Sequence, residues 1–146
     1  MDYIIQRLNP AEILEAIELI SQTFQQFVAP DYEKKGVESF YNFINLAENI
    51  EKMEFFGAFD DSNLTGVLST INNRSHICCF FVKADAHRRG IAKSLFSYLL
   101  KHSTNNCYTV NSSPYAAEFY KKMGFVPTNS EQIADGIRFT PMTYKR

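Results

Sequence analysis

Residues 76–102 place an apolar strand, a basic turn and a helix in direct succession. The run His76–Val82 has the composition of a buried strand, and Gly90 then opens a pattern with apolar side chains at helical spacing. At such a helix start, the free N–H groups and the positive end of the helix dipole point the same way. Arg88 and Arg89 add positive charge there. The junction therefore predicts a binding site for a phosphate or pyrophosphate.

The composition indicates a soluble globular protein with a single domain, residues 1–146. Hydrophobic residues make up 45% and charged residues 21%, and a chain of this length can bury a core without disulfides or metal. The formal net charge of −1 gives no overall attraction to nucleic acid or to an anionic membrane. No apolar run approaches the roughly 18–20 residues that span a bilayer, so neither kind of partner is expected.

The three cysteines are interpreted as reduced thiols of a cytoplasmic protein. Cys78 and Cys79 are neighbours in a predicted strand, so their side chains are expected on opposite faces, where they cannot readily pair. The chain has neither a C-x-x-C nor an H-E-x-x-H motif, and no metal site is predicted.

The order of predicted elements is β-α-α-β-β-β-α-β-α-β-β, which favours the α/β or α+β class with a mixed sheet and helices on both faces. Strands 76–82 and 107–110, joined by a helix, should be parallel neighbours whose ends splay apart beside the anion-binding turn. The other strands are expected at 3–8, 54–59, 64–71, 125–126 and 137–144, and the helices at 10–27, 37–47, 90–102 and 114–123.

Two segments carry a resemblance to a known family. Residues 87–92 read His-Arg-Arg-Gly-Ile-Ala, and residues 119–125 read Phe-Tyr-Lys-Lys-Met-Gly-Phe. With the element order, they resemble the Gln/Arg-x-x-Gly-x-Gly/Ala motif and the later Tyr-x-x-x-Gly-Phe segment of the GNAT superfamily of N-acetyltransferases. The resemblance covers essentially the whole chain. His87 departs from the Gln or Arg usual at the first motif position.

The resemblance implies that the chain binds acetyl-CoA. Backbone N–H groups of the turn would hold the pyrophosphate, and the main chain of Phe80–Val82 would pair with the pantetheine arm and donate to the thioester carbonyl. Asn111 and Ser113 are side-chain contacts in this scheme, Ser113 standing where many relatives have asparagine. The expected cofactor-binding residues are Phe80, Phe81, Val82, His87, Arg88, Arg89, Gly90, Ile91, Ala92, Lys93, Asn111 and Ser113.

The implied reaction is direct transfer of the acetyl group to a primary amine within a ternary complex. Tyr120 is placed by the resemblance as the general acid that protonates the departing CoA sulfur. Reference pKa values of about 10 for tyrosine and 8.5 for a thiol make that proton transfer uphill by roughly 2 kcal/mol. The alternative is that Tyr120 only packs in the core, because its spacing from its helical neighbours fits that role too.

The base is harder to assign, since a lysine-like amine is neutral at pH 7 only about once in 2,500. His76 is the titratable base candidate on its strand, but it lies roughly 13 Å along the strand from Phe80, too far for direct proton abstraction. Asp31, Glu33 and Glu38 lie in a segment that often walls the acceptor pocket in this family. Each is a candidate substrate contact, and each also fits a solvated helix charge.

Two other functions stay open from the sequence. One is a non-catalytic acyl-CoA-binding module of the same fold, and the other is a domain for a different phosphate ligand that would not need Tyr120. The acceptor is a small-molecule or peptide amine, and a homodimer is an expectation that rests on the resemblance alone. The 13 phenylalanines have the spacing of core residues, with a few left to line an acceptor pocket.

Overall fold

The computed structural model describes residues 3–87 and 89–146, and within these ranges the strands form a mixed eight-stranded sheet. The sheet order is β1-β2-β3-β4-β5-β8-β6, with β7 paired to β8. The strands are β1 Ile4–Arg7, β2 Glu54–Asp60, β3 Asn63–Ile71, β4 His76–Val82, β5 Cys107–Ser112, β6 Val126–Pro127, β7 Gln132–Ala134 and β8 Ile137–Lys145. The α-helices are α1 Ile13–Thr23, α2 Lys34–Asn45, α3 Ala47–Lys52, α4 Ile91–Lys101 and α5 Ala117–Met123.

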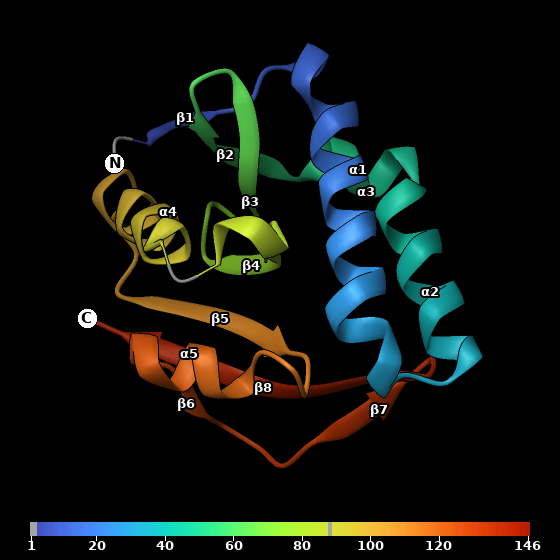
Figure 1. Ribbon diagram of the computed structural model, residues 1–146. Coiled ribbons are helices and arrows are strands. Elements are labelled where there is room, and N and C mark those ends of the chain that lie inside the picture. The colour runs from blue at the N-terminus through green and yellow to red at the C-terminus, as the bar shows by residue number, and fades with distance from the viewer. Residues whose placement is uncertain (1–2, 88) are drawn as a thin grey trace.

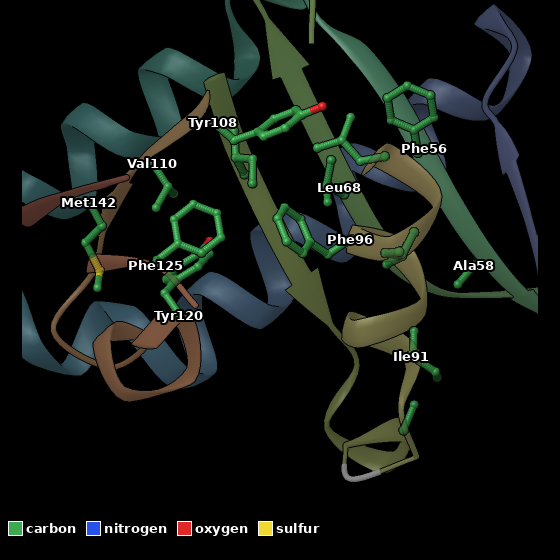
Figure 2. Close-up of a cluster of buried hydrophobic side chains, with 14 residues drawn as sticks. Phe56, Ala58, Leu68, Ile91, Phe96, Tyr108, Val110, Tyr120, Phe125 and Met142 are labelled. Atoms are coloured by element: carbon green, nitrogen blue, oxygen red, sulfur yellow. The ribbon is translucent and has the colours of Figure 1, made fainter. Parts of the chain in front are cut away.

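Helices cover both faces of the sheet, as the element order predicts (Figure 1). On one face, α1 to α3 pack their apolar side chains against β2, β3 and β4. On the other face, α4 and α5 bury a second cluster (Figure 2), in which Phe96 of α4 lies 5.3 Å from the ring of Phe125. Phe125 in turn lies 5.3 Å from Tyr120 of α5, so the two helices share one aromatic core on that face.

Strands β4 and β5 are parallel and separate after two residue pairs, His76↔Thr109 and Ile77↔Val110. The cause lies in β4, where the register against β3 shifts and leaves Cys78 as an extra residue. Such a bulge bends a strand and increases its local twist. The bulge lies directly after the last pair with β5, so it turns β4 away from β5. The predicted splayed strand pair is confirmed.

The bulge also changes the expectation for the two adjacent cysteines. Cys78 and Cys79 both pack toward the α1 side of the sheet, so the prediction that they face opposite sides is wrong. The extra residue interrupts the alternation of side chains, which the prediction took as regular. Both are free thiols.

Three further elements differ from the prediction. The first helix changes at Thr23 into the π-helical turn Phe24–Val28, which the helical spacing of its phenylalanines does not distinguish from an α-helix. The short helix α3 follows α2 and was not expected. Strand β7 was also missed, although Asp135-Gly136 is a strong hairpin signal, and both residues have positive φ, 53° and 79°. None of the helices within residues 3–87 and 89–146 is long and apolar enough to cross a membrane.

Arg74 stabilises the turn between β3 and β4 through its hydrogen bonds. Asn72, Asn73 and Arg74 in this turn all have positive φ. Its guanidinium donates to both carboxylate oxygens of Glu54, at 2.8 and 2.9 Å, and to the carbonyl oxygen of His102 at 2.7 Å. Arg74→Ala is expected to lower the free energy of unfolding by about 2 kcal/mol, since charge-assisted bonds are lost and Glu54 stays half-buried. Urea unfolding measures this.

Arg7 offers the matched control for that substitution. It also pairs with Glu54, at 3.4 Å, but its side chain is 63% exposed. Arg7→Ala is therefore expected to change the free energy of unfolding by less than about 0.5 kcal/mol. Equal losses in the two variants would show that the bidentate geometry of Arg74 contributes nothing beyond its charge.

Candidate functional site

A cavity of about 840 Å³ lies where β4 and β5 separate, and it continues under α1 and α2. It contains most of the residues that the sequence singles out. Those lining it are His76, Phe80, Phe81, Val82, His87, Gly90, Ile91, Ala92, Lys93, Asn111, Ser113 and Tyr120. Residues far apart in the sequence thus meet at one site.

The start of α4 forms one end of this cavity. The first intrahelical bond runs from the N–H of Ser94 to the carbonyl of Gly90 at 3.0 Å, so the N–H groups of Ile91, Ala92 and Lys93 precede it. Gly90 has φ +78°, a conformation that side chains disfavour, and a Cβ there would meet no atom within 4 Å. The helix start therefore presents open backbone donors, which suit an anion.

The free edge of β4 supplies main-chain groups beside this end. The N–H of Lys83 donates to the carbonyl of Thr65 at 2.9 Å, which fixes which residues of β4 bond to β3. Bonded and non-bonded pairs alternate along an antiparallel ladder, so Phe81 bonds to β3 while Phe80 and Val82 do not. The N–H and carbonyl groups of Phe80 and Val82 therefore point toward the split.

His87 has a structural partner that explains how it fits this turn. Its Nε2 lies 2.7 Å from the carbonyl oxygen of Val82, and because a carbonyl only accepts, Nε2 carries the hydrogen. The imidazole also lies 4.9 Å from the ring of Phe27, which stacks on Tyr115 at 5.2 Å. His87 thus ties the turn to the end of β4 and to the π-helical turn across the cavity.

Arg88, a predicted site residue, falls outside the described residues, and four others lie away from the cavity. The Arg89 guanidinium donates to Asp60 at 2.9 Å in the β2–β3 turn and does not line the cavity. Asp31, Glu33 and Glu38 are exposed and also stand outside the cavity lining.

Asn111 and Ser113, at the end of β5 and just after it, differ in their exposure and hydrogen bonds. Asn111 is exposed and lies on the same face of β5 as Thr109, toward the cavity. The Ser113 hydroxyl accepts from the N–H of Ala116 at 3.2 Å, so it caps the turn before α5. Asn111 is therefore the freer of the two to meet a ligand.

Tyr120 lines the cavity from α5 and is only 5% exposed. Its ring packs against Phe80 at 6.2 Å and Phe125 at 5.3 Å. Burial raises the pKa of its hydroxyl well above the ordinary value of 10.0. The hydroxyl therefore stays protonated at neutral pH.

His76 lies at the paired end of β4 and lines the cavity. Its Nδ1 lies 2.7 Å from the Thr109 hydroxyl, and burial lowers its pKa below the ordinary value of 6.5.

The lowered pKa of His76 makes the stability of the protein depend on pH. Since the unfolded chain binds a proton at His76 more readily than the folded chain, the free energy of unfolding falls as the pH drops below 6.5. His76→Gln is expected to reduce that fall, measured by urea unfolding across this pH range. Identical slopes for the two proteins would contradict it.

Aromatic side chains wall the end of the cavity away from the anion-binding turn. The sequence pattern predicts nearly all phenylalanines in the core, because burial and cavity lining give the same helical spacing. Phe24 of the wall comes from the π-helical turn, a feature frequent at functional sites, and Phe27 of the same turn lies against His87. The wall contains Phe24, Tyr32, Phe40, Phe43 and Phe81, with Ile137 beside them.

A contact between α2 and the β7–β8 turn closes this wall, and we call it the hairpin contact (Figure 1). The Tyr32 hydroxyl donates to the carbonyl of Arg138 at 3.1 Å, and the Ser39 hydroxyl donates to the carbonyl of Asp135 at 2.6 Å. Gly36 lies directly against Gly136, where a Cβ on Gly36 would lie 2.1 Å from the Gly136 oxygen. The two glycines let helix and hairpin backbones touch.

The sequence matches the model of one protein family, described as an acetyltransferase (GNAT) domain, over residues 28–146. No curated protein matches it significantly. Among solved structures, a GCN5-related N-acetyltransferase from Rhodopseudomonas palustris is similar, with a TM-score of 0.85 and 20% identity over 100% of this chain and 97% of that chain.

Two other solved structures share the fold. The PaiA N-acetyltransferase of Thermoplasma acidophilum, in complex with coenzyme A, has a TM-score of 0.71 and 21% identity over 100% of both chains. FeeM, an N-acyl amino acid synthase from uncultured soil microbes, has a TM-score of 0.71 and 18% identity over 99% of this chain and 91% of that chain.

Proposed function

Because the chain belongs to the GNAT acetyltransferase family, we propose that it transfers an acetyl group from acetyl-CoA to a primary amine. The observation that carries the proposal is one cavity that joins an anion-binding helix start, a free strand edge and a buried tyrosine. The similar Thermoplasma structure holds coenzyme A, which supports the choice of donor. When bound, acetyl-CoA supplies an activated thioester.

Different groups of the chain would bind different parts of acetyl-CoA. The N–H groups of Ile91, Ala92 and Lys93 would hold the pyrophosphate at the start of α4. The N–H of Phe80 or Val82 would donate to the thioester carbonyl, and Asn111 would contact the pantetheine amides. These groups fit because they face the cavity and are not used within the sheet or helix.

The reaction needs one proton to leave the amine and one to reach the sulfur. The amine nitrogen forms a bond to the acetyl carbon, the carbon–sulfur bond breaks, and the products are an amide and CoA. Tyr120 would donate its proton to the departing thiolate and recover one from water. Burial makes the tyrosine a weaker acid, and the same apolar surroundings make the thiolate a stronger base, so the two effects oppose one another.

Release of free CoA from acetyl-CoA in the presence of a panel of amines tests the function. We expect acetyl-CoA to bind the full-length chain, measured by calorimetry, and CoA release to depend on the amine. Binding without release for every amine would favour the non-catalytic module instead. Absence of binding would overturn both.

A further inference from the structure

The end of the cavity under α1 and α2 is a wall of packed aromatic rings. Phe24 stacks on Phe40 with ring centroids 3.9 Å apart and planes inclined by 8°. Tyr32 meets Phe24 edge-on at 5.6 Å, and Phe81 meets Phe40 edge-on at 6.1 Å. Rings held in this way present faces and edges that a planar aromatic ligand can complement.

The charges around this wall do not suit a cationic acceptor. The ionisable side chains that line the cavity are Tyr32, His76, Cys78, His87, Lys93, Tyr115 and Tyr120. Within the described ranges 3–87 and 89–146, no aspartate or glutamate lines it. An ammonium group entering there loses its hydration and gains no carboxylate partner.

Two carboxylates on the elements that surround the wall pair with neighbouring cations, and Asp31 and Glu33 are exposed and stand outside the cavity lining. Glu38 of α2 is 62% exposed and pairs with Lys34 at 3.9 Å. Glu131 pairs with Arg138 at 3.1 Å, beside the β7–β8 hairpin. Burial also raises the pKa of Tyr32 to about 12, so its hydroxyl stays neutral at pH 7. The wall is therefore apolar and uncharged.

The protonation state of the acceptor amine also argues against a cationic acceptor. An alkyl amine is neutral at pH 7 only about once in 2,500, which costs roughly 4.6 kcal/mol unless a base assists. No carboxylate of the described residues stands in the cavity to act as that base, and His76 lies at the paired end of β4 with its Nδ1 2.7 Å from the Thr109 hydroxyl. An amine attached directly to an aromatic ring is already neutral, because its lone pair is delocalised into the ring.

We propose that the acceptor is an aromatic amine whose nitrogen is bonded to the ring and uncharged at neutral pH. This inference rests on the proposed acetyltransferase function and narrows its substrate class. The ring of the acceptor packs within the wall formed by Phe24, Phe40 and Phe81, and its nitrogen meets the thioester where β4 and β5 separate. The reacting amine loses its proton to water only as the amide bond forms.

The test compares two isomeric amines, 4-methylaniline and benzylamine, and the dication putrescine. With saturating acetyl-CoA at pH 7, kcat/KM from CoA release is expected to be at least about tenfold higher for 4-methylaniline than for benzylamine. The lower nucleophilicity of the arylamine removes part of the advantage that its neutrality gives. The kcat/KM of benzylamine should rise with pH while that of 4-methylaniline stays level. A preference for benzylamine or putrescine at pH 7 would overturn the inference.

A variant tests the wall directly. Phe43→Glu places a carboxylate in it and is expected to lower the ratio of kcat/KM for 4-methylaniline over benzylamine at least tenfold. Asn42→Glu, which adds a carboxylate on the same helix outside the cavity lining, should leave that ratio unchanged. Acetyl-CoA binding by calorimetry reports whether each variant is folded. If Phe43→Glu does not bind acetyl-CoA, the ranking of the three amines by the wild-type chain decides alone.

The two proposals fail in different ways. CoA release that favours cationic amines would overturn the acceptor class and leave the acetyltransferase function intact. Acetyl-CoA binding without release for any of these and other amines would overturn the function itself.

Discussion

Tyr120→Phe is expected to lower kcat about a hundredfold and to leave the affinity for acetyl-CoA nearly unchanged. The substitution keeps the ring, which packs against Phe80 and Phe125, and removes only the hydroxyl that would protonate the leaving thiolate. The rate of CoA release under saturating substrates measures kcat, and calorimetry measures the dissociation constant. The size of the loss is typical for removal of a general acid.

Tyr115→Phe is the matched control for Tyr120→Phe. Tyr115 also lines the cavity, but it is 50% exposed and its ring stacks on Phe27. Loss of its hydroxyl is expected to change kcat by less than a factor of about two, because no step of the reaction uses it. If both variants keep the wild-type kcat while binding acetyl-CoA, Tyr120 is a packing residue.

The stability at alkaline pH provides a second readout for Tyr120. Its pKa in the folded chain is raised by burial above the unfolded value of 10.0. Its contribution to the free energy of unfolding is therefore present below pH 10.0 and is lost as the pH rises further, because the unfolded chain releases the proton first. Tyr120→Phe should make that alkaline loss smaller. An unchanged loss would show that burial does not hold this hydroxyl protonated.

The geometry of the proposed donor end could be predicted because its signals are local. A strand, a glycine with positive φ and the first turn of a helix follow one another within residues 76–93, so short-range pattern determines their geometry. The parallel pairing of β4 and β5 follows from the helix that joins them. Which main-chain groups of β4 face the split depends on the register of β4 against β3. No local sequence pattern determines that register, so the sequence could not show that Phe80 and Val82 face the split while Phe81 does not.

Other features of the site could not be predicted because long-range contacts build them. The bulge at Cys78 depends on how β3 and β4 align, and the same sequence would also fit a regular strand. Arg89 was expected to face the anion, but the β2–β3 turn brings Asp60 within 2.9 Å of it. The hairpin contact joins residues about a hundred positions apart, and only the Asp135-Gly136 turn was visible in the sequence.

Gly36→Ala is expected to lower the acceptor kcat/KM at least tenfold and to leave acetyl-CoA binding unchanged. In an ordinary helix this change would stabilise the fold by about 0.5–1 kcal/mol, because alanine loses less conformational freedom than glycine. Here the new Cβ would lie 2.1 Å from the Gly136 oxygen, a backbone atom, so helix or hairpin must shift. The steric overlap should outweigh the gain in helix propensity and lower the free energy of unfolding by about 1–3 kcal/mol.

The loss of activity follows from what the hairpin contact positions. Tyr32 and Ile137 line the acceptor wall, and both belong to the segments that the two glycines bring together. A shift of the hairpin displaces this wall relative to the thioester, and small misplacements of reacting groups are costly. The proposed donor end, formed by β4 and the start of α4, lies outside this contact. The affinity for acetyl-CoA should therefore be unchanged.

Asn42→Ala provides the control on the same helix. Asn42 is exposed, so alanine there raises helix propensity without meeting the hairpin, and it should keep kcat/KM and slightly raise the free energy of unfolding. Steady-state kinetics with 4-methylaniline and urea unfolding compare the two variants. If Gly36→Ala behaves like Asn42→Ala in both measurements, the hairpin tolerates displacement and the acceptor wall does not depend on it.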